Sequence, residues 1–439
     1  MLVLGVLIAA ISSDASANGR FPTTVDVRFH PADDSMRLVS ATFGLLISSD
    51  GGASYQWVCE VAIGYGGTYD PDYAVAADGS IFATTFDGLR VSRDGGCTFE
   101  LVGGELDGLF PGAVDVAPNG DVWTCATLLS DNGAFRSTDN GVSFARTNVD
   151  VTGAWWHSIA VAPTDSNRVY VSGFVTPGTT PDAGPGMNNV RVLRTDDAGD
   201  AWIELPATGF VLGDEQDVFI EAVSPTDPDV VYARVRRANP PNGDAVYRSD
   251  DAGQSWVKVL DTLDAITAFV ARADGTTVIV GTQFDGVRIS PNRGASWSLT
   301  AAQPQMGCVG ERGDGELFAC GANWEPDHFA LGRSTTGQTW QTVLEFREIA
   351  GPLECAPGTL QFDECTVKLW PSLAEQLGVG VGGDDAGPID AGAGIDAAPG
   401  IDAPAGATID AGTGDGGGDC GCSTAFAAAV FVWPRRRRR

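Results

Sequence analysis

Residues 48–55 read Ser-Ser-Asp-Gly-Gly-Ala-Ser-Tyr, and they contain the pattern Ser-x-Asp-x-Gly-x-x-aromatic. The pattern returns six more times in the central part of the chain, at intervals of 41 to 58 residues. This interval is the repeat length of a four-stranded β-propeller blade. The third position of the seven copies is occupied by Asp50, Asp94, Asp139, Asp197, Asp251, Asn292 and Thr335.

The sequence around each copy also repeats. Two apolar segments separated by a turn precede the pattern, as residues 114–117 and 121–125 do around Pro118-Asn119-Gly120. A third apolar segment leads into the pattern, and its aromatic residue begins a fourth. Alternating apolar residues with turns at this spacing predict short strands. We therefore expect an all-β fold, a seven-bladed β-propeller with four-stranded blades, over residues 18–346. Residues 347–377 are expected to form a small closing or cap segment, pinned by a disulfide, with a short helix at 372–377.

The chemistry of the pattern explains why it favours a hairpin. A carboxylate at the third position accepts hydrogen bonds from backbone N–H groups of its own turn. The glycine permits a backbone conformation that other residues resist, and the aromatic side chain buries a large apolar area between blades. The seven third-position residues are therefore predicted to be structural and not catalytic.

These copies resemble Asp boxes, also called BNR repeats, of the sialidase and photosystem II assembly factor-like superfamily. Xyloglucan-cleaving glycoside hydrolases and sortilin-type receptors carry the same repeat. The resemblance covers about three quarters of the chain and implies the propeller fold. It implies no single function, because proteins with these repeats include hydrolases, receptors and assembly factors.

Both ends of the chain differ from the repeats. The apolar run 2–11, followed by Ala15-Ser16-Ala17, is typical of an export signal over residues 1–17; a buried first strand is the alternative. Residues 378–419 consist almost entirely of Gly, Ala, Asp, Pro and Ile. Such a composition predicts a disordered, acidic stalk, with a calcium-binding Asp array as the alternative.

Residues 420–439 contain Cys420 and Cys422, a short apolar stretch and five arginines. This order resembles the MYXO-CTERM sorting signal of myxobacterial surface proteins. The resemblance implies processing near the cysteines and anchoring at the cell surface or outer membrane, with membrane contact only through this tail. The apolar stretch is about half as long as a membrane-spanning helix, so free secretion is the alternative.

The nine cysteines bear on disulfides and metal sites. We expect bridges Cys308–Cys320 and Cys355–Cys365, because each pair could span one hairpin. At least one further cysteine, with Cys125 as the candidate, is expected to be unpaired or to pair with a partner that the sequence does not identify. The cysteine spacing does not support a zinc site, and the three histidines lie in different repeats. We predict no metal and no cofactor. The net charge of −30 argues against nucleic acid as a partner, and we expect a monomer.

Ligands of propellers usually bind on the face opposite the Asp boxes, where the loops that join strands two and three and those that join consecutive blades meet. Trp side chains stack on sugar rings, while carboxylates and arginines bind hydroxyls, so such residues there are candidates for a glycan site. Each has a structural alternative: a Trp could plug the channel, an Arg could pair with a neighbouring acid. The candidates are Trp155, Trp156, His157, Asp214, Glu215, Asp217, Arg236, Arg237, Trp324, Glu325, Asp327 and His328.

The preferred hypothesis is a non-catalytic module that binds a protein or a polysaccharide. A glycosidase is the main alternative, because it needs only two carboxylates roughly 5–10 Å apart. A sialidase is disfavoured. Arg20-Phe21-Pro22 does not match the Phe-Arg-Ile-Pro motif of that family, and no tyrosine follows Tyr247 to serve as its late nucleophile.

Overall fold

The computed structural model describes residues 20–380, except 128–131, 150, 152, 176–188, 208, 211–214 and 238–242. The expected export signal, nearly all of the expected stalk, and the sorting signal with Cys420 and Cys422 lie outside the described residues. Within the described part, no helix is long and apolar enough to cross a membrane.

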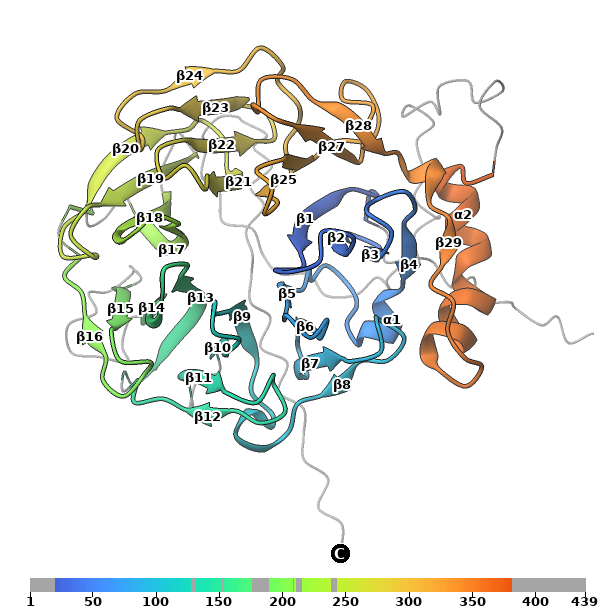
Figure 1. The fold of residues 1–439 in the computed structure, drawn as a ribbon, viewed down its shortest axis with the longest axis horizontal. Helices are drawn as coiled ribbons and strands as arrows, with labels where there is room; N and C mark the ends of the chain where they lie inside the picture. Colours follow the sequence, from blue (N-terminus) through green and yellow to red (C-terminus); the bar gives the residue numbers. More distant parts are fainter. Residues whose placement is uncertain are drawn as a thin grey trace, which may run out of the picture. The chain divides into compact units, whose positions relative to one another are not determined.

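The strands form seven antiparallel sheets arranged in a ring, which confirms the predicted seven-bladed propeller (Figure 1). Blades 1 to 4 follow the chain order: β1 (Thr24–Phe29), β2 (Arg37–Ala41), β3 (Gly44–Ser48), β4 (Gln56–Val58); β5 (Tyr73–Val75), β6 (Ile81–Thr85), β7 (Gly88–Ser92), β8 (Glu100–Leu101); β9 (Pro111–Val116), β10 (Val122–Ala126), β11 (Ala134–Ser137), β12 (Ala145–Arg146); β13 (Ala154–Ala162), β14 (Asp165–Val175), β15 (Asn189–Thr195), β16 (Ile203–Glu204).

The remaining blades continue in the same order: β17 (Glu215–Ser224), β18 (Asp227–Arg237), β19 (Asp244–Ser249), β20 (Val257–Asp261); β21 (Ile266–Ala271), β22 (Val278–Thr282), β23 (Val287–Ser290), β24 (Ser298–Leu299); β25 (Cys308–Glu311), β26 (Leu317–Cys320), β27 (Leu331–Ser334), β28 (Gln341–Leu344). The second strands β2, β6, β10, β22 and β26 are buried at every position. Apolar side chains on both faces of these strands pack against the neighbouring blades, and this burial drives the assembly of the ring.

The turn between the third and fourth strand, here called the box turn, has the hydrogen bonds that the sequence predicts. In blade 3, the Ser137 hydroxyl accepts a hydrogen bond from the Gly141 N–H (2.8 Å), and Asp139 accepts one from the Ser143 N–H (2.9 Å). The Ser143 hydroxyl donates a further bond to Asp139, and these bonds lower the pKa of Asp139 to about 2. The first, second, fourth, fifth and sixth box turns repeat the two backbone bonds.

The seventh box turn is one residue shorter between its serine and its glycine. Ser334 accepts a hydrogen bond from Gly337 (2.8 Å), three residues on, where the other turns use the residue four positions on. The aromatic Trp340 nevertheless packs against the cluster that includes Ile279 and Leu317. The last blade therefore keeps its packing although Thr335 replaces the aspartate.

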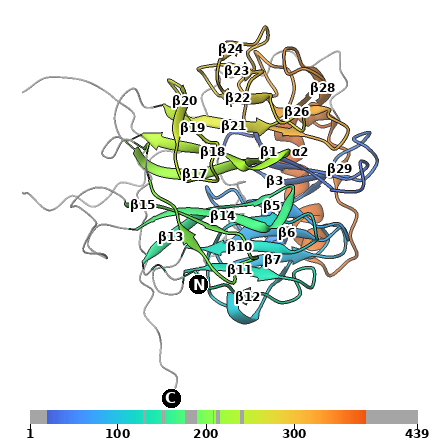
Figure 2. The same cartoon turned by 60° about the vertical axis from the view of Figure 1, so that its left-hand side comes forward.

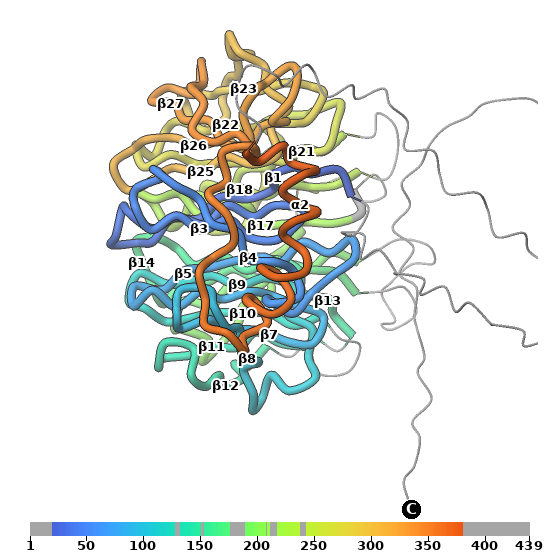
Figure 3. Tube along the Cα trace, turned by 90° about the vertical axis from the view of Figure 1, so that its right-hand side faces the viewer, coloured from blue at the N-terminus to red at the C-terminus, as the bar shows by residue number. Residues whose placement is uncertain are grey.

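The four main strands of blade 1, and those of blade 7, each come from one continuous stretch of chain, and a fifth strand from the C-terminal segment joins the sheet of blade 1. Residues after blade 7 pass over the outside of blade 1 and return as a helix (Figure 3). This C-terminal segment contains η2 (Phe346–Glu348), β29 (Gly351–Pro352), the π-helical η3 (Gln361–Leu369) and α2 (Trp370–Leu377). β29 pairs in parallel with β4. The helix predicted at 372–377 is confirmed and begins earlier.

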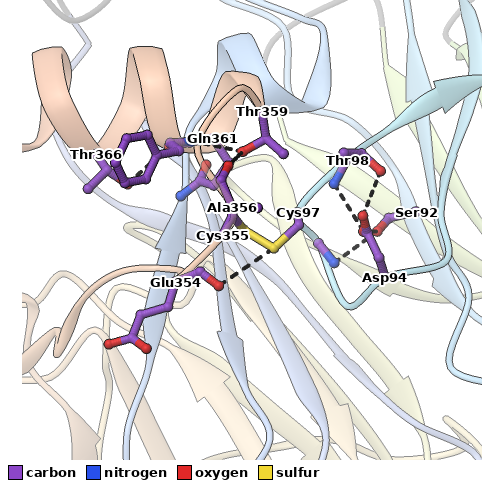
Figure 4. Close-up of a disulfide and its surroundings, with 12 residues drawn as sticks. Ser92, Asp94, Cys97, Thr98, Glu354, Cys355, Ala356, Thr359, Gln361 and Thr366 are labelled. Atoms are coloured by element: carbon purple, nitrogen blue, oxygen red, sulfur yellow. Dashed lines mark hydrogen bonds between the residues drawn. A yellow bond between two sulfur atoms is a disulfide. The ribbon is translucent and has the colours of Figure 1, made fainter.

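Two disulfides attach the C-terminal segment to the ring. Cys97 in the second box turn bonds to Cys355 (Figure 4), and Cys59, just after β4, bonds to Cys365 in η3. The predicted Cys355–Cys365 bridge is therefore wrong. These two cysteines lie on an extended stretch and on a helix, not on two strands of a hairpin, and each faces a different blade.

The other two cysteine predictions are confirmed. Cys308 and Cys320 are directly opposite on β25 and β26 and form the third disulfide, while Cys125 is free and buried. The three disulfides within residues 20–380 indicate an oxidising, extracellular environment.

We expect the bond Cys59–Cys365 to be worth about 4 kcal/mol of unfolding free energy, from the loop-closure entropy of the unfolded chain. When the Cys97–Cys355 bond is present, the Cys59–Cys365 bond closes an effective loop of roughly fifty residues, and this loop length gives the value of about 4 kcal/mol. The double variant Cys59→Ser/Cys365→Ser tests it by chemical denaturation. Cys308→Ser/Cys320→Ser is the control and should cost less, because its loop spans 12 residues. Equal costs would contradict a role in closing the ring.

Ser137→Ala should lower the free energy of unfolding by about 1–2 kcal/mol, because it leaves the buried Gly141 N–H without its acceptor. The exposed neighbouring change Val142→Ala should have almost no effect. Thermal and denaturant unfolding measure both; a cost for Ser137→Ala no larger than that of the control would contradict the importance of this hydrogen bond.

Candidate binding site at the junction of blades 4 and 5

Blades 4 and 5 have longer inner strands than the other blades. β13, β14, β17 and β18 contain 9, 11, 10 and 11 residues. The first and second strands of the other five blades contain 3 to 6. The strands are longer at both ends. Residues 165–168 of β14 and 227–230 of β18 extend toward the box turns. Trp155 on β13 and Arg236 on β18 lie in the extensions toward the opposite face, and the long strands are visible side by side in Figure 2. These extensions carry most of the candidates predicted from the sequence.

Aromatic rings form a continuous row across the two blades. Trp155 on β13 lies opposite Phe174 on β14, with parallel rings whose centroids are 6.0 Å apart. The ring of His157 lies 5.8 Å from Phe174 and 4.2 Å from Phe219 of blade 5. Arg234 then lies over Phe219, at 4.2 Å from the ring centroid. All five side chains are partly exposed.

Charged side chains lie beside this row, at the junction between blades 4 and 5. One carboxylate oxygen of Asp217 lies 3.1 Å from His157 Nε2, and the other lies 3.1 Å from Arg236. His157 Nε2 is also 2.8 Å from the Val218 carbonyl oxygen. A carbonyl only accepts hydrogen bonds, so Nε2 carries a proton and donates it there. The structure thus brings His157 of blade 4 to Asp217 and Arg236, which lie opposite each other on adjacent strands of blade 5.

Burial controls the electrostatics of this group. It lowers the pKa of His157, and the nearby Asp217 carboxylate opposes this change. Burial raises the pKa of Asp217, opposed by His157 and Arg236. The Asp217 side chain is only 4% exposed, whereas Arg236 is 48% exposed. Arg236 is therefore the charged group that a ligand can reach, and Asp217 holds it in place.

Other candidates from these blades have different positions. Trp156 is fully buried in the core that contains Cys125. Arg237 donates to the carbonyl oxygens of Asp244 and Thr262 and ion-pairs with Asp261, so it holds the strands of blade 5 together. Asp214 and the side chain of Glu215 lie outside the described residues.

The candidates in blade 7 do not join the junction, because blade 6 lies between blade 7 and blade 5. Trp324 packs edge-on against Phe346, and Asp327 accepts hydrogen bonds from the backbone of Ala322 and Gln305. Glu325 and His328 are exposed and pair with each other at 3.2 Å. Trp324 and Asp327 thus hold their loop against η2 and against the segment that precedes β25.

Sequence reasoning missed Phe174, Phe219 and Arg234, which complete the row. It also missed two aspartates that join neighbouring blades. Asp72 accepts a hydrogen bond from the Val114 N–H (2.9 Å), and Asp115 accepts one from the Val161 N–H (2.8 Å). Burial raises the pKa of Asp115 to about 6. Its second oxygen accepts a hydrogen bond from the Val116 N–H, so both oxygens of this carboxylate are bound by backbone donors.

No group of three or more His, Cys, Asp or Glu side chains in the described ranges is arranged to hold a metal ion. The site offers aromatic faces for stacking and the guanidinium of Arg236, which Asp217 holds in place. Such a combination recognises a ligand through apolar faces and hydrogen-bond acceptors.

Several solved structures are similar to this chain. A GH74 xyloglucanase from Xanthomonas campestris is 14% identical, with 78% of this chain and 66% of that chain covered and a TM-score of 0.37. YCF48 bound to D1 peptide is 14% identical, with 68% and 90% covered and a TM-score of 0.46. A protein of unknown function from Dyadobacter fermentans is 12% identical, with 74% and 94% covered and a TM-score of 0.41.

The chain spans slightly less than two thirds of the xyloglucanase and about half, 49%, of an ancestral GH74 enzyme. No protein-family model matches the sequence, and no curated protein matches it.

The pKa of His157 should lie below the ordinary value of about 6.5, since burial disfavours its charged form. The unfolded chain then binds a proton that the folded chain does not, so the free energy of unfolding should fall as pH drops through about 6.5. His157→Gln should remove this component. NMR titration of the histidine ring signals, assigned with this variant, measures the pKa. Asp217→Asn should lower it further; a His157 pKa above 6.5 would show that the ion pair outweighs burial.

Proposed function

We propose that this protein is a non-catalytic binding module, exported and held at the cell surface, whose ligand is a protein or a glycan that docks at the junction of blades 4 and 5. The observation that supports this proposal is the aromatic row from Trp155 to Phe219, extended by the exposed Arg236. Flat rings stack on sugar faces or on apolar side chains, and an arginine at their edge binds a carboxylate, hydroxyl or carbonyl oxygen.

The burial and the contacts of Asp217 support a binding function over a catalytic one. A general acid or base must reach the reacting atom of the substrate. Asp217 is almost completely buried and lies between His157 and Arg236, so it positions the arginine and does not face a ligand. The carboxylates of Asp327 and Asp115 are likewise engaged by backbone N–H groups.

A carbohydrate-active hydrolase is the alternative, and it has a specific requirement. Two carboxylates must stand roughly 5–10 Å apart beside the bound sugar. Asp214 and Glu215, which precede the junction in the sequence, are the residues that would supply them. The three disulfides support export. The resemblance of the C-terminal tail to a sorting signal supports surface anchoring.

The test is a binding screen of the purified full-length chain against polysaccharides, oligosaccharides and envelope proteins, with product analysis of every glycan that binds. Arg236→Ala and Trp155→Ala should each weaken binding about tenfold, equivalent to about 1.4 kcal/mol. Arg347→Ala is the matched control, because Arg347 is similarly exposed, pairs with the adjacent Glu345, and lies in the C-terminal segment.

Binding without cleavage, weakened by the two junction variants and unchanged in the control, supports the proposal. Cleavage that is lost in Asp214→Asn or Glu215→Gln would establish the hydrolase. Binding that none of the junction variants affects would place the ligand elsewhere on the propeller.

A further inference from the structure

One core position differs between blade 1 and the other six blades. The residue directly opposite the first residue of each box turn is aliphatic in blades 2 to 7 and has 0–1% relative exposure there. In blade 1 the same register position, opposite Ser48, holds Arg37, which is also buried at 2% exposure. The six aliphatic residues are Ile81, Val122, Val169, Val231, Val278 and Leu317.

Arg37 has no counter-charge of its own. One terminal nitrogen donates to the Gly51 carbonyl oxygen (2.6 Å), and the other lies 3.4 Å from the Tyr55 hydroxyl. Its Nε has no hydrogen-bond partner, and no carboxylate in the described part of the chain forms an ion pair with it. By contrast, Arg168, in blade 4, pairs with both Asp196 and Asp229.

A buried cation without an anion is costly to the folded state. An aliphatic residue evidently fits this position, because six blades of the same chain use one. The charge of Arg37 therefore calls for an anion that the described chain does not provide.

A pocket of about 320 Å³ adjoins Arg37 between blades 7 and 1. It lies on the face of the propeller that carries the box turns, and the proposed site at the junction of blades 4 and 5 lies on the other face. Arg312 and Arg333 also line it, and Phe318 forms an apolar wall beneath the guanidinium groups of Arg37 and Arg312, at 4.7 and 5.3 Å. Gly52 completes the rim, where a Cβ would lie 2.7 Å from Arg37.

The charges favour an occupant with one negative charge. Glu316 and Asp314 pair with Arg312, and Glu316 also lies 3.8 Å from Arg333. Asp34 acts on Arg312 from beyond ion-pair distance. Of the three arginines that line the pocket, Arg37 is the one that has no carboxylate within ion-pair distance among the described residues. The planar fork of arginine matches a carboxylate in two parallel hydrogen bonds. The pocket volume is that of about ten water molecules at ~30 Å³ each, which suits a small molecule.

We propose that the pocket between blades 7 and 1 binds a small organic monocarboxylate, with Arg37 as the buried anchor and Arg333 at the entrance. The site is separate from the proposed ligand site at blades 4 and 5 and does not depend on it. A doubly charged phosphate would leave excess negative charge beside Glu316, so we expect carboxylates to be preferred.

The experiment is isothermal titration calorimetry of the full-length chain with acetate, lactate and glucuronate, and with phosphate and sulfate for comparison. We expect at least one of the carboxylates to bind, more tightly than phosphate or sulfate. Arg37→Leu should reduce the affinity for the bound carboxylate at least tenfold. It should leave the melting temperature of the ligand-free protein unchanged or higher, because a leucine fills the same position in blade 7. Arg333→Gln should weaken binding without affecting folding, and Arg347→Leu should change neither.

Three results would overturn the proposal: no binding of any carboxylate; equal or tighter binding of phosphate or sulfate; or unchanged affinity in Arg37→Leu. A melting temperature of ligand-free Arg37→Leu several degrees below that of the parent would also overturn it, by showing that Arg37 is a structural cation. Because Arg333 is half exposed, the Arg333→Gln variant tests the entrance of the pocket without a change in the core, and unchanged affinity in this variant would also contradict the proposal.

Discussion

The contact between the first and last blades is the constraint on which the whole propeller depends. Each blade hides its apolar faces against two neighbours, so an open ring would expose one face of blade 1 and one of blade 7 to water. Neither blade borrows a strand from the other. They meet instead through side chains such as Phe29 and Phe318, and through the Thr24 hydroxyl, which donates to the Ala330 carbonyl oxygen.

The C-terminal segment supports this closure from outside the ring. It adds a strand to blade 1, packs Trp370 against Trp57, and is joined by disulfides to cysteines at the edges of blades 1 and 2. These bonds link residues that are 306 and 258 positions apart. Together they restrict the unfolded chain, since the first bond closes a long loop and the second, with the first in place, closes an effective loop of roughly fifty residues. An exported protein can rely on such bonds, since its surroundings keep them oxidised.

The proposed sites lie where individual blades depart from the repeat. Blades 4 and 5 lengthen their inner strands and thereby carry Trp155 and Arg236 beyond the common body of the ring, next to His157. Blade 1 replaces a core aliphatic residue by Arg37, and blade 7 shortens its box turn at the same seam. A regular repeat satisfies its own packing and hydrogen bonds, so departures that carry an energetic cost, such as a buried cation, point to a role beyond folding.

The sequence by itself determined the features that depend on neighbours a few residues apart. The four-stranded period, the hydrogen bonds of the box turns, the helix ending at Leu377 and the Cys308–Cys320 bridge all follow from local spacing, because strand alternation and turn geometry act over about ten residues. Only the tertiary structure decided which distant groups meet. The partners of Cys355 and Cys365, the contact between His157 and Asp217, the burial of Trp156 beside an accessible Trp155, and the missing counter-charge of Arg37 depend on how blades pack around the ring. That packing brings together side chains from different repeats, and no local pattern encodes their pairing.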